Sequence, residues 1–173
     1  MRISGLTLLV IFAKLVPAMQ GSDSYTVCEI LAENPTRLNG HRLRITGLLE
    51  GGDEGAWVDG ECTSALTTYG VTWPNIIWLD FNPDNLRAQA AWKRMSEKLA
   101  KLHATVRDNI RVTILGKFET RESMRDAVVT GPNGRPRKAG FGHMGTAPAT
   151  MEVLDITDVI VTKKARIKEN TRP

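Results

Sequence analysis

Three side chains in two loop-like segments are the candidates for recognising a ligand. Trp73 lies just before a proline, and Phe141 and His143 lie in the run Gly-Phe-Gly-His. Glycines let a backbone approach another surface closely, and a histidine donates or accepts a hydrogen bond near neutral pH. We expect Trp73, Phe141 and His143 to line one shared ligand-binding surface. In the alternative, Phe141 plugs one end of the core and His143 bonds to a backbone carbonyl.

Acidic and aromatic residues are interleaved in the first half of the chain. Residues 45–86 hold seven carboxylates and no lysine or arginine, together with Trp57, Tyr69 and Trp78. Exposed indoles beside carboxylates can stack on sugar rings while the acids accept hydrogen bonds from hydroxyls, so a sugar-recognising accessory domain is one alternative. We expect Trp57 and Trp78 in the core and Trp73 exposed. Carboxylate pairs leave a hydrolase as a weaker alternative.

No catalytic residue, metal site or cofactor is assigned. His41, His103 and His143 are too scattered for a metal triad, and the acids after Asp53 do not match a calcium-binding loop. The acidic first hairpin would repel phosphates, which argues against a nucleic-acid partner. We therefore expect a non-catalytic binding or interaction module whose ligand is a protein, a peptide or a glycan.

The N-terminal segment has the composition of an export signal. Arg2 supplies a positive start, residues 8–12 are apolar, and residues 16–18 are Val-Pro-Ala, which suits a cleavage site. We expect a signal peptide over residues 1–18, with cleavage after Ala18 or up to residue 21. The product is then secreted or periplasmic and has no transmembrane segment. A buried N-terminal helix is the alternative.

The two cysteines, Cys28 and Cys62, are expected to form one disulfide. An oxidising compartment favours pairing, and no Cys-x-x-Cys spacing points to redox chemistry. On the chain-entropy model, a closed loop of about 35 residues is worth roughly 3–4 kcal/mol.

The apolar spacing predicts one mainly β (α+β) domain over residues 25–162. The composition, 42% hydrophobic and 24% charged, is typical of a single globular domain. We expect a short helix over 26–33, strands over 42–49, 56–58, 76–81, 110–119 and 151–161, and a long helix capped by Asp84. The apolar stripe of the long helix is Ala88, Trp92, Met95, Leu99, Leu102 and Val106. The basic residues 163–173 are expected to be a disordered tail.

The order of these elements, β-β-β-α-β-β, is that of a five-stranded OB-fold barrel with a helix between its third and fourth strands. A small open α+β sheet with the same elements is the alternative. The last strand changes its apolar phase after Val153 and after Ile156, which predicts a bulge. The connection over 120–149 is far longer than the usual connection of about 2–6 residues. A loop of this length is expected to be either functional or disordered. We expect a mobile hairpin tip in its first half.

Four sequence strings carry a resemblance to a known group. They are Val-Cys-Glu-Ile-Leu at 27–31, Gly-Leu-Leu-Glu-Gly-Gly-Asp-Glu-Gly-Ala-Trp at 47–57, Trp-Pro-Asn-Ile-Ile-Trp-Leu at 73–79 and Gly-Phe-Gly-His at 140–143. With Cys62, these strings resemble uncharacterised exported bacterial proteins with an OB-like core. The resemblance covers about residues 25–162 and implies export and fold. It implies no catalytic residue.

Overall fold

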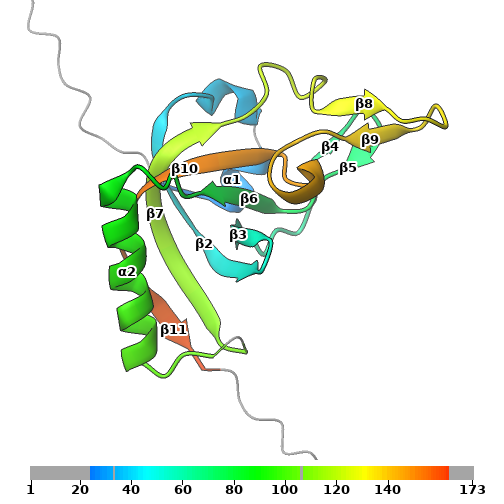
Figure 1. Ribbon diagram of the computed structural model, residues 1–173. Coiled ribbons are helices and arrows are strands. Elements are labelled where there is room, and N and C mark those ends of the chain that lie inside the picture. Colours follow the sequence, from blue (N-terminus) through cyan, green and yellow to red (C-terminus); the bar gives the residue numbers. More distant parts are fainter. Residues whose placement is uncertain (1–23, 33, 106, 164–173) are drawn as a thin grey trace, which may run out of the picture.

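The computed structural model describes residues 24–32, 34–105 and 107–163, and this part of the chain is mainly β (Figure 1). Its main sheet has seven strands, and two small two-stranded sheets accompany it. In chain order the elements are β1 (Ser24–Thr26), α1 (Val27–Ala32), η1 (Pro35–Leu38), β2 (Arg42–Gly52), β3 (Gly55–Asp59), β4 (Thr67–Thr68), β5 (Val71–Thr72), β6 (Ile76–Asp80), α2 (Leu86–Lys101), β7 (Asn109–Glu119), β8 (Val128–Thr130), β9 (Pro136–Lys138), η2 (His143–Gly145), β10 (Ala149–Ile156) and β11 (Ile160–Thr162). The expected signal peptide and the tail beyond Lys163 lie outside the described residues.

The main sheet contains the five predicted strands, the last of them divided into β10 and β11, together with one short strand, β1, that was not predicted. Its order is β1-β2-β3-β6-β10-β7-β11, and β2 also pairs with β7. The pairs β2–β3, β3–β6, β10–β7 and β2–β7 are antiparallel, whereas β6–β10 and β1–β2 are parallel. One edge of β2 therefore meets β1 and then β3, and its other edge meets β7.

The last predicted strand is divided in two. The register between β10 and β7 shifts between Val153 and Asp155, which confirms the predicted bulge. Because Val153 and Ile156 are both buried, the extra residue of the bulge is what keeps both side chains on the inner face. The chain then leaves the sheet, and β11 pairs with the start of β7 from Ile160 opposite Arg111.

The long helix α2 begins one residue later than predicted. Asn85, not Asp84, is its N-cap, and the Asn85 side chain accepts hydrogen bonds from the backbone N–H groups of Arg87 and Ala88. The helix buries Ala88, Ala91 and Met95 and packs against β10. The predicted apolar stripe is only partly covered, since Trp92 is 39% exposed and Leu102 is 43% exposed. Val106 lies outside the described residues.

Two hydrophobic clusters stabilise the fold. The larger one gathers the inward side chains of the main sheet with α1 and α2, and includes Ile45, Ile77, Ile114, Phe118 and Met151. The smaller one consists of Val71, Trp73, Met124 and Ala127. It belongs to the hairpins β4–β5 and β8–β9, which form within the two segments expected to be loops (Figure 1). Long connections therefore fold as hairpins with a core of their own.

The predicted disulfide is confirmed. Cys28 on α1 and Cys62 after β3 are joined, with 5.4 Å between their Cα atoms. The bond attaches α1 to the segment that leads into the smaller cluster. Among the described residues, no helix is both long and apolar enough to span a membrane.

Candidate functional site

Trp73 is buried, so the expectation of an exposed ring is wrong. Its side chain is 1% exposed within the smaller cluster. The indole N–H donates a hydrogen bond to Thr68 Oγ1 at 2.7 Å, and Lys138 Nζ lies 5.8 Å from the ring centroid. The physical reason is that β4–β5 and β8–β9 fold over the ring. The first of these hairpins was not predicted, and the second was expected only as a mobile tip. Trp73 therefore contacts its own domain rather than the solvent.

Phe141 lies in a compact segment formed by residues 140–147, hereafter the 140–147 segment. Phe141 and Ala147 form a β-bridge, with backbone N···O distances of 2.9 and 3.1 Å. The Arg121 guanidinium lies over the half-buried Phe141 ring, 4.9 Å from its centroid. Arg121 also donates hydrogen bonds to the carbonyls of Ala139 and Gly140. These bonds give the segment a defined shape.

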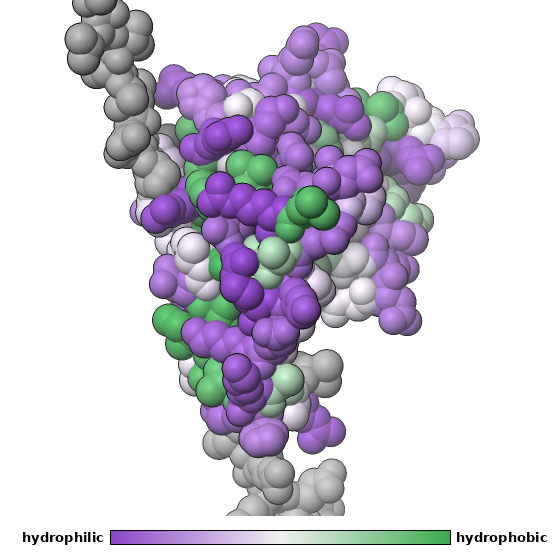
Figure 2. Space-filling view, turned by 60° about the vertical axis from the view of Figure 1, so that its left-hand side comes forward, coloured by the Kyte–Doolittle hydropathy of each residue, from purple (hydrophilic) through white to green (hydrophobic). Residues whose placement is uncertain are grey.

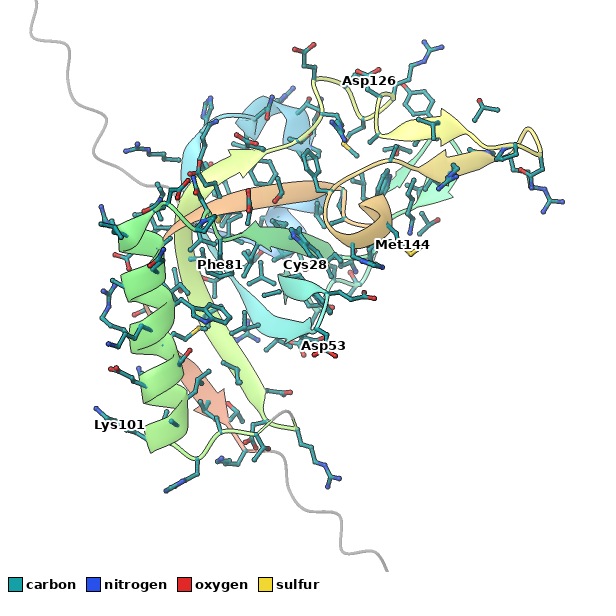
Figure 3. All side chains as sticks on the ribbon, viewed as in Figure 1. Cys28, Asp53, Phe81, Lys101, Asp126 and Met144 are labelled. Atoms are coloured by element: carbon teal, nitrogen blue, oxygen red, sulfur yellow. A yellow bond between two sulfur atoms is a disulfide. The ribbon has the colours of Figure 1, made fainter. Side chains whose placement is uncertain are left out.

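His143 joins the 140–147 segment to the β2–β3 turn. Its Nε2 atom lies 3.3 Å from Glu54 Oε1, and both side chains are exposed, by 47% and 63%. Two connections that are far apart in the sequence thus meet beside β3. In Figure 3, the labels of Asp53 and Met144, the chain neighbours of Glu54 and His143, mark these two connections.

The 140–147 segment rests on Trp78. Gly142 has φ +70°, and a Cβ atom there would lie 2.2 Å from the Trp78 ring. On its other side, a Cβ atom at Gly140 would lie 2.9 Å from Trp73. The predicted close approach of these glycines to another surface is therefore present, and the surfaces are two tryptophan rings. Phe141 and His143 thus lie in one segment, and Trp73 lies beneath Gly140 of that segment without contributing to the exposed surface.

Trp57 and Trp78 form a stacked pair that was wrongly expected in the core. They are opposite each other in the β3–β6 register, with ring centroids 5.9 Å apart and planes inclined by 20°. Both are half-buried, because Val58 and Ile77 beside them point inward and alternation along a strand turns the tryptophans outward. The period of two was the signal in the sequence that could have placed them on the outer face.

A carboxyl group with a shifted pKa belongs to the same face. Asp59 follows Trp57 by two residues on β3, and so it lies on the same side of the strand. Partial burial, together with the negative charges of Glu50 and Glu61, raises the Asp59 pKa above its ordinary value. Glu61 itself pairs with Arg111 at 3.1 Å. We call the surface formed by Trp57, Trp78, Asp59, Glu54 and His143 the tryptophan face.

The tryptophan face offers one stacked aromatic pair, carboxylate acceptors and an imidazole. Within residues 24–32, 34–105 and 107–163, no three His, Cys, Asp or Glu side chains converge as metal ligands would. An arrangement of this kind suits stacking and hydrogen bonding with a bound molecule. No family model, curated protein or solved structure matches the chain.

Proposed function

We propose that the chain is an exported, non-catalytic binding module that takes its ligand on the tryptophan face. One observation carries this proposal: the Trp57–Trp78 stack is bordered by Glu54 and His143, which come from two separate connections. Aromatic rings supply contact area, while convergent polar groups orient a ligand. Export is supported by the disulfide, because such bonds persist in oxidising compartments.

The strand pairing supports an OB-like barrel as the framework of this module. From β2 the pairing runs through β3, β6, β10 and β7 and returns to β2, and α2 lies between β6 and β7 in the chain. In OB-folds the second and third strands, with the connections after the first and fourth, form the binding face. The corresponding elements are β3, β6, the turn with Glu54 and the connection with His143, which build the tryptophan face.

A sugar is the ligand class that the tryptophan face favours. An indole plane matches the apolar face of a sugar ring, and ionised carboxylates accept hydrogen bonds from hydroxyls. Gly55 and Gly142 lie against the Trp78 ring, and no glycine contact described falls on Trp57. Trp57 is therefore the ring proposed to stack on the ligand, and Trp78 the ring that supports it.

A glycan and peptide array probed with the full chain tests this function. We expect saturable binding of a glycan without turnover, and Trp57→Ala should weaken it at least about tenfold, as for a central aromatic contact. His143→Ala should weaken it while shifting the melting temperature little, because an exposed ion pair contributes about 0–1 kcal/mol.

Trp92→Ala is the matched control for the array, because Trp92 is an exposed tryptophan on α2, outside the tryptophan face. Unchanged affinity in Trp57→Ala would contradict the proposed face. Binding restricted to peptides would contradict the sugar assignment, and release of a cleaved product would identify a hydrolase.

A further inference from the structure

A cleft separates α2 from the β2–β3 hairpin. Its volume is about 670 Å3, and its apolar walls are Leu49, Ala56, Phe81, Trp92, Leu99 and Ile110. The helix packs against β10, and so it leaves this side of the hairpin uncovered. Figure 2, which brings the α2 side forward, shows hydrophobic patches among hydrophilic residues on this side of the molecule. A cleft of this size and lining is in the range of a binding site.

The cleft continues past an aromatic pair into a second hollow. Phe81 and Trp92 meet edge to face, with ring centroids 4.6 Å apart. Both rings also line a neighbouring hollow of about 280 Å3, next to Pro83 and Gln89. The two hollows share this pair of rings, so a chain bound in the cleft has the second hollow beside it.

One wall of the cleft is an unpaired strand edge. The register between β2 and β7 ends at Leu48 opposite Arg111, whereas β2 continues to Gly52 against β3 alone. Arg111 is paired with β11 as well as with β2, so β11 lies on the other edge of β7 and leaves the edge of β2 uncovered. Five consecutive residues, 48–52, line the cleft. Because side chains alternate between the two faces of a strand, the side chains of one face could supply only every second residue. Residues 49–52 thus present backbone groups to the cleft, over roughly 13 Å of strand.

The cleft contains two carboxylates, and one of them, Glu50, has no positively charged partner among the described residues. Glu50 is exposed, and no hydrogen bond or ion pair to it is present among the described residues. On the opposite wall, the Asp108 carboxylate is bound by Lys163 Nζ at 2.9 Å and by the Thr105 backbone N–H at 2.8 Å. These partners lower the Asp108 pKa to about 2. Asp108 is therefore ionised but already paired, and Glu50 is the carboxylate available to a cation.

We propose that an extended peptide segment in which basic and large apolar residues alternate binds in this cleft and adds a strand to β2 at residues 49–52. Its main chain bonds to the free edge, a basic side chain pairs with Glu50, and apolar side chains occupy the hollows beside Phe81 and Trp92. Strand addition takes affinity from backbone bonds and specificity from alternate side chains. This site adjoins the tryptophan face, because Glu50 lies opposite Trp57 in the β2–β3 register, but the strand edge and the hollows beside Phe81 and Trp92 are not part of that face.

A fluorescently labelled hexapeptide, Leu-Lys-Leu-Lys-Leu-Lys with blocked ends, is the probe. We expect saturable binding to the full chain, and a Leu-Glu-Leu-Glu-Leu-Glu peptide should bind at least about tenfold more weakly because like charges meet at Glu50. N-methylation of one alternating set of peptide nitrogens should abolish binding, whereas N-methylation of the other set should not, since only one set faces the edge. Equal binding of both methylated peptides would overturn strand addition.

Glu50→Gln should weaken binding of the probe by about three- to tenfold, and the matched control Glu97→Gln, on the exposed side of α2, should not. His143→Ala should bind the probe normally, because His143 is not among the residues that line the cleft, and this result distinguishes the cleft from the tryptophan face. Failure of the lysine peptide to bind, or equal affinity of Glu50→Gln and the unchanged protein, would overturn the proposal.

Two other occupants are distinguished by the same titration. Glutamine in place of Lys164, Arg166 and Lys168 would raise the affinity for the probe if the chain's own C-terminal residues filled the cleft. Self-association that the probe reverses would assign the cleft to a second copy of the chain. Either result would overturn the proposal, whereas unchanged affinity and a monomer in sedimentation support it.

Discussion

Gly142 shows how a missing side chain determines the position of a loop. Its backbone has φ +70° and ψ −164°, a region that is almost confined to glycine. Its Cα also faces the Trp78 ring at a distance that leaves no space for a Cβ atom. Both properties are needed to hold His143 beside Glu54.

Gly142→Ala should therefore cost more stability than an alanine at another glycine with positive φ. Gly134 is the matched control, because its φ is +72° and nothing lies within 4 Å of an added Cβ atom. We expect a loss of about 1 kcal/mol for Gly134→Ala, from the backbone alone. For Gly142→Ala we expect about 2–4 kcal/mol, because steric overlap adds to the backbone cost.

Urea unfolding of both variants measures this difference. The His143–Glu54 contact should also be lost in Gly142→Ala, because the segment must move away from Trp78. Equal losses of stability in the two variants would mean that the segment does not rest on the ring.

At the scale of elements, α2 is attached to β10 in two ways. Arg87 and Arg94 both pair with Asp155, at 3.3 and 2.8 Å, while Ala91 and Met95 pack into the main core. The arginine side chains are 66% and 58% exposed, so solvent screens their attraction to Asp155. The buried residues are 0% and 3% exposed. Packing should therefore contribute more than the ion pairs.

Met95→Ala should lower the free energy of unfolding by about 2–5 kcal/mol, which is the usual cost of a cavity in a core. Asp155→Asn should lower the free energy of unfolding by at most about 1 kcal/mol for each of the ion pairs with Arg87 and Arg94, and by less at high salt. Asparagine keeps the side-chain oxygen that accepts from the Ile156 N–H, so this variant isolates the charge. Chemical denaturation at low and high salt compares the two, and a larger loss in Asp155→Asn would contradict this account.

At the scale of the whole molecule, the disulfide joins α1 to the segment after β3. Cys28 and Cys62 are 34 residues apart, and between them lie η1, β2 and β3. Reduction frees this loop only in the unfolded chain, because the folded sheet keeps both ends close. The bond therefore acts mainly on the entropy of the unfolded state.

Replacing both Cys28 and Cys62 by alanine should lower the free energy of unfolding by about 3–4 kcal/mol. The fold should persist, since the disulfide lies beside the main core rather than inside it. Guanidinium unfolding of the variant and of the oxidised protein measures the change, with thiol labelling of the oxidised protein as the control. Full thiol labelling without a reductant would contradict the bond, and an unchanged midpoint would contradict its contribution.

Periodicity in the sequence determined the elements that are regular and long. The alternation in residues 42–49 and 110–119 predicted β2 and β7, because side chains on a strand point alternately to the core and away from it. The phase change after Val153 predicted the bulge for the same reason. Two cysteines in an export-like chain predicted the Cys28–Cys62 bond.

Only the tertiary structure determined which distant segments of the chain contact one another. Alternation states which residues of a strand share a side, but β4, β5, β8 and β9 have only two or three residues each, too few for a period to emerge. Their packing buries Trp73. The stacking of Trp57 on Trp78, the contact of His143 with Glu54 and the cleft beside α2 depend on pairs of segments far apart in the chain. Local spacing holds no information on such distances, because they arise only when the strands pair.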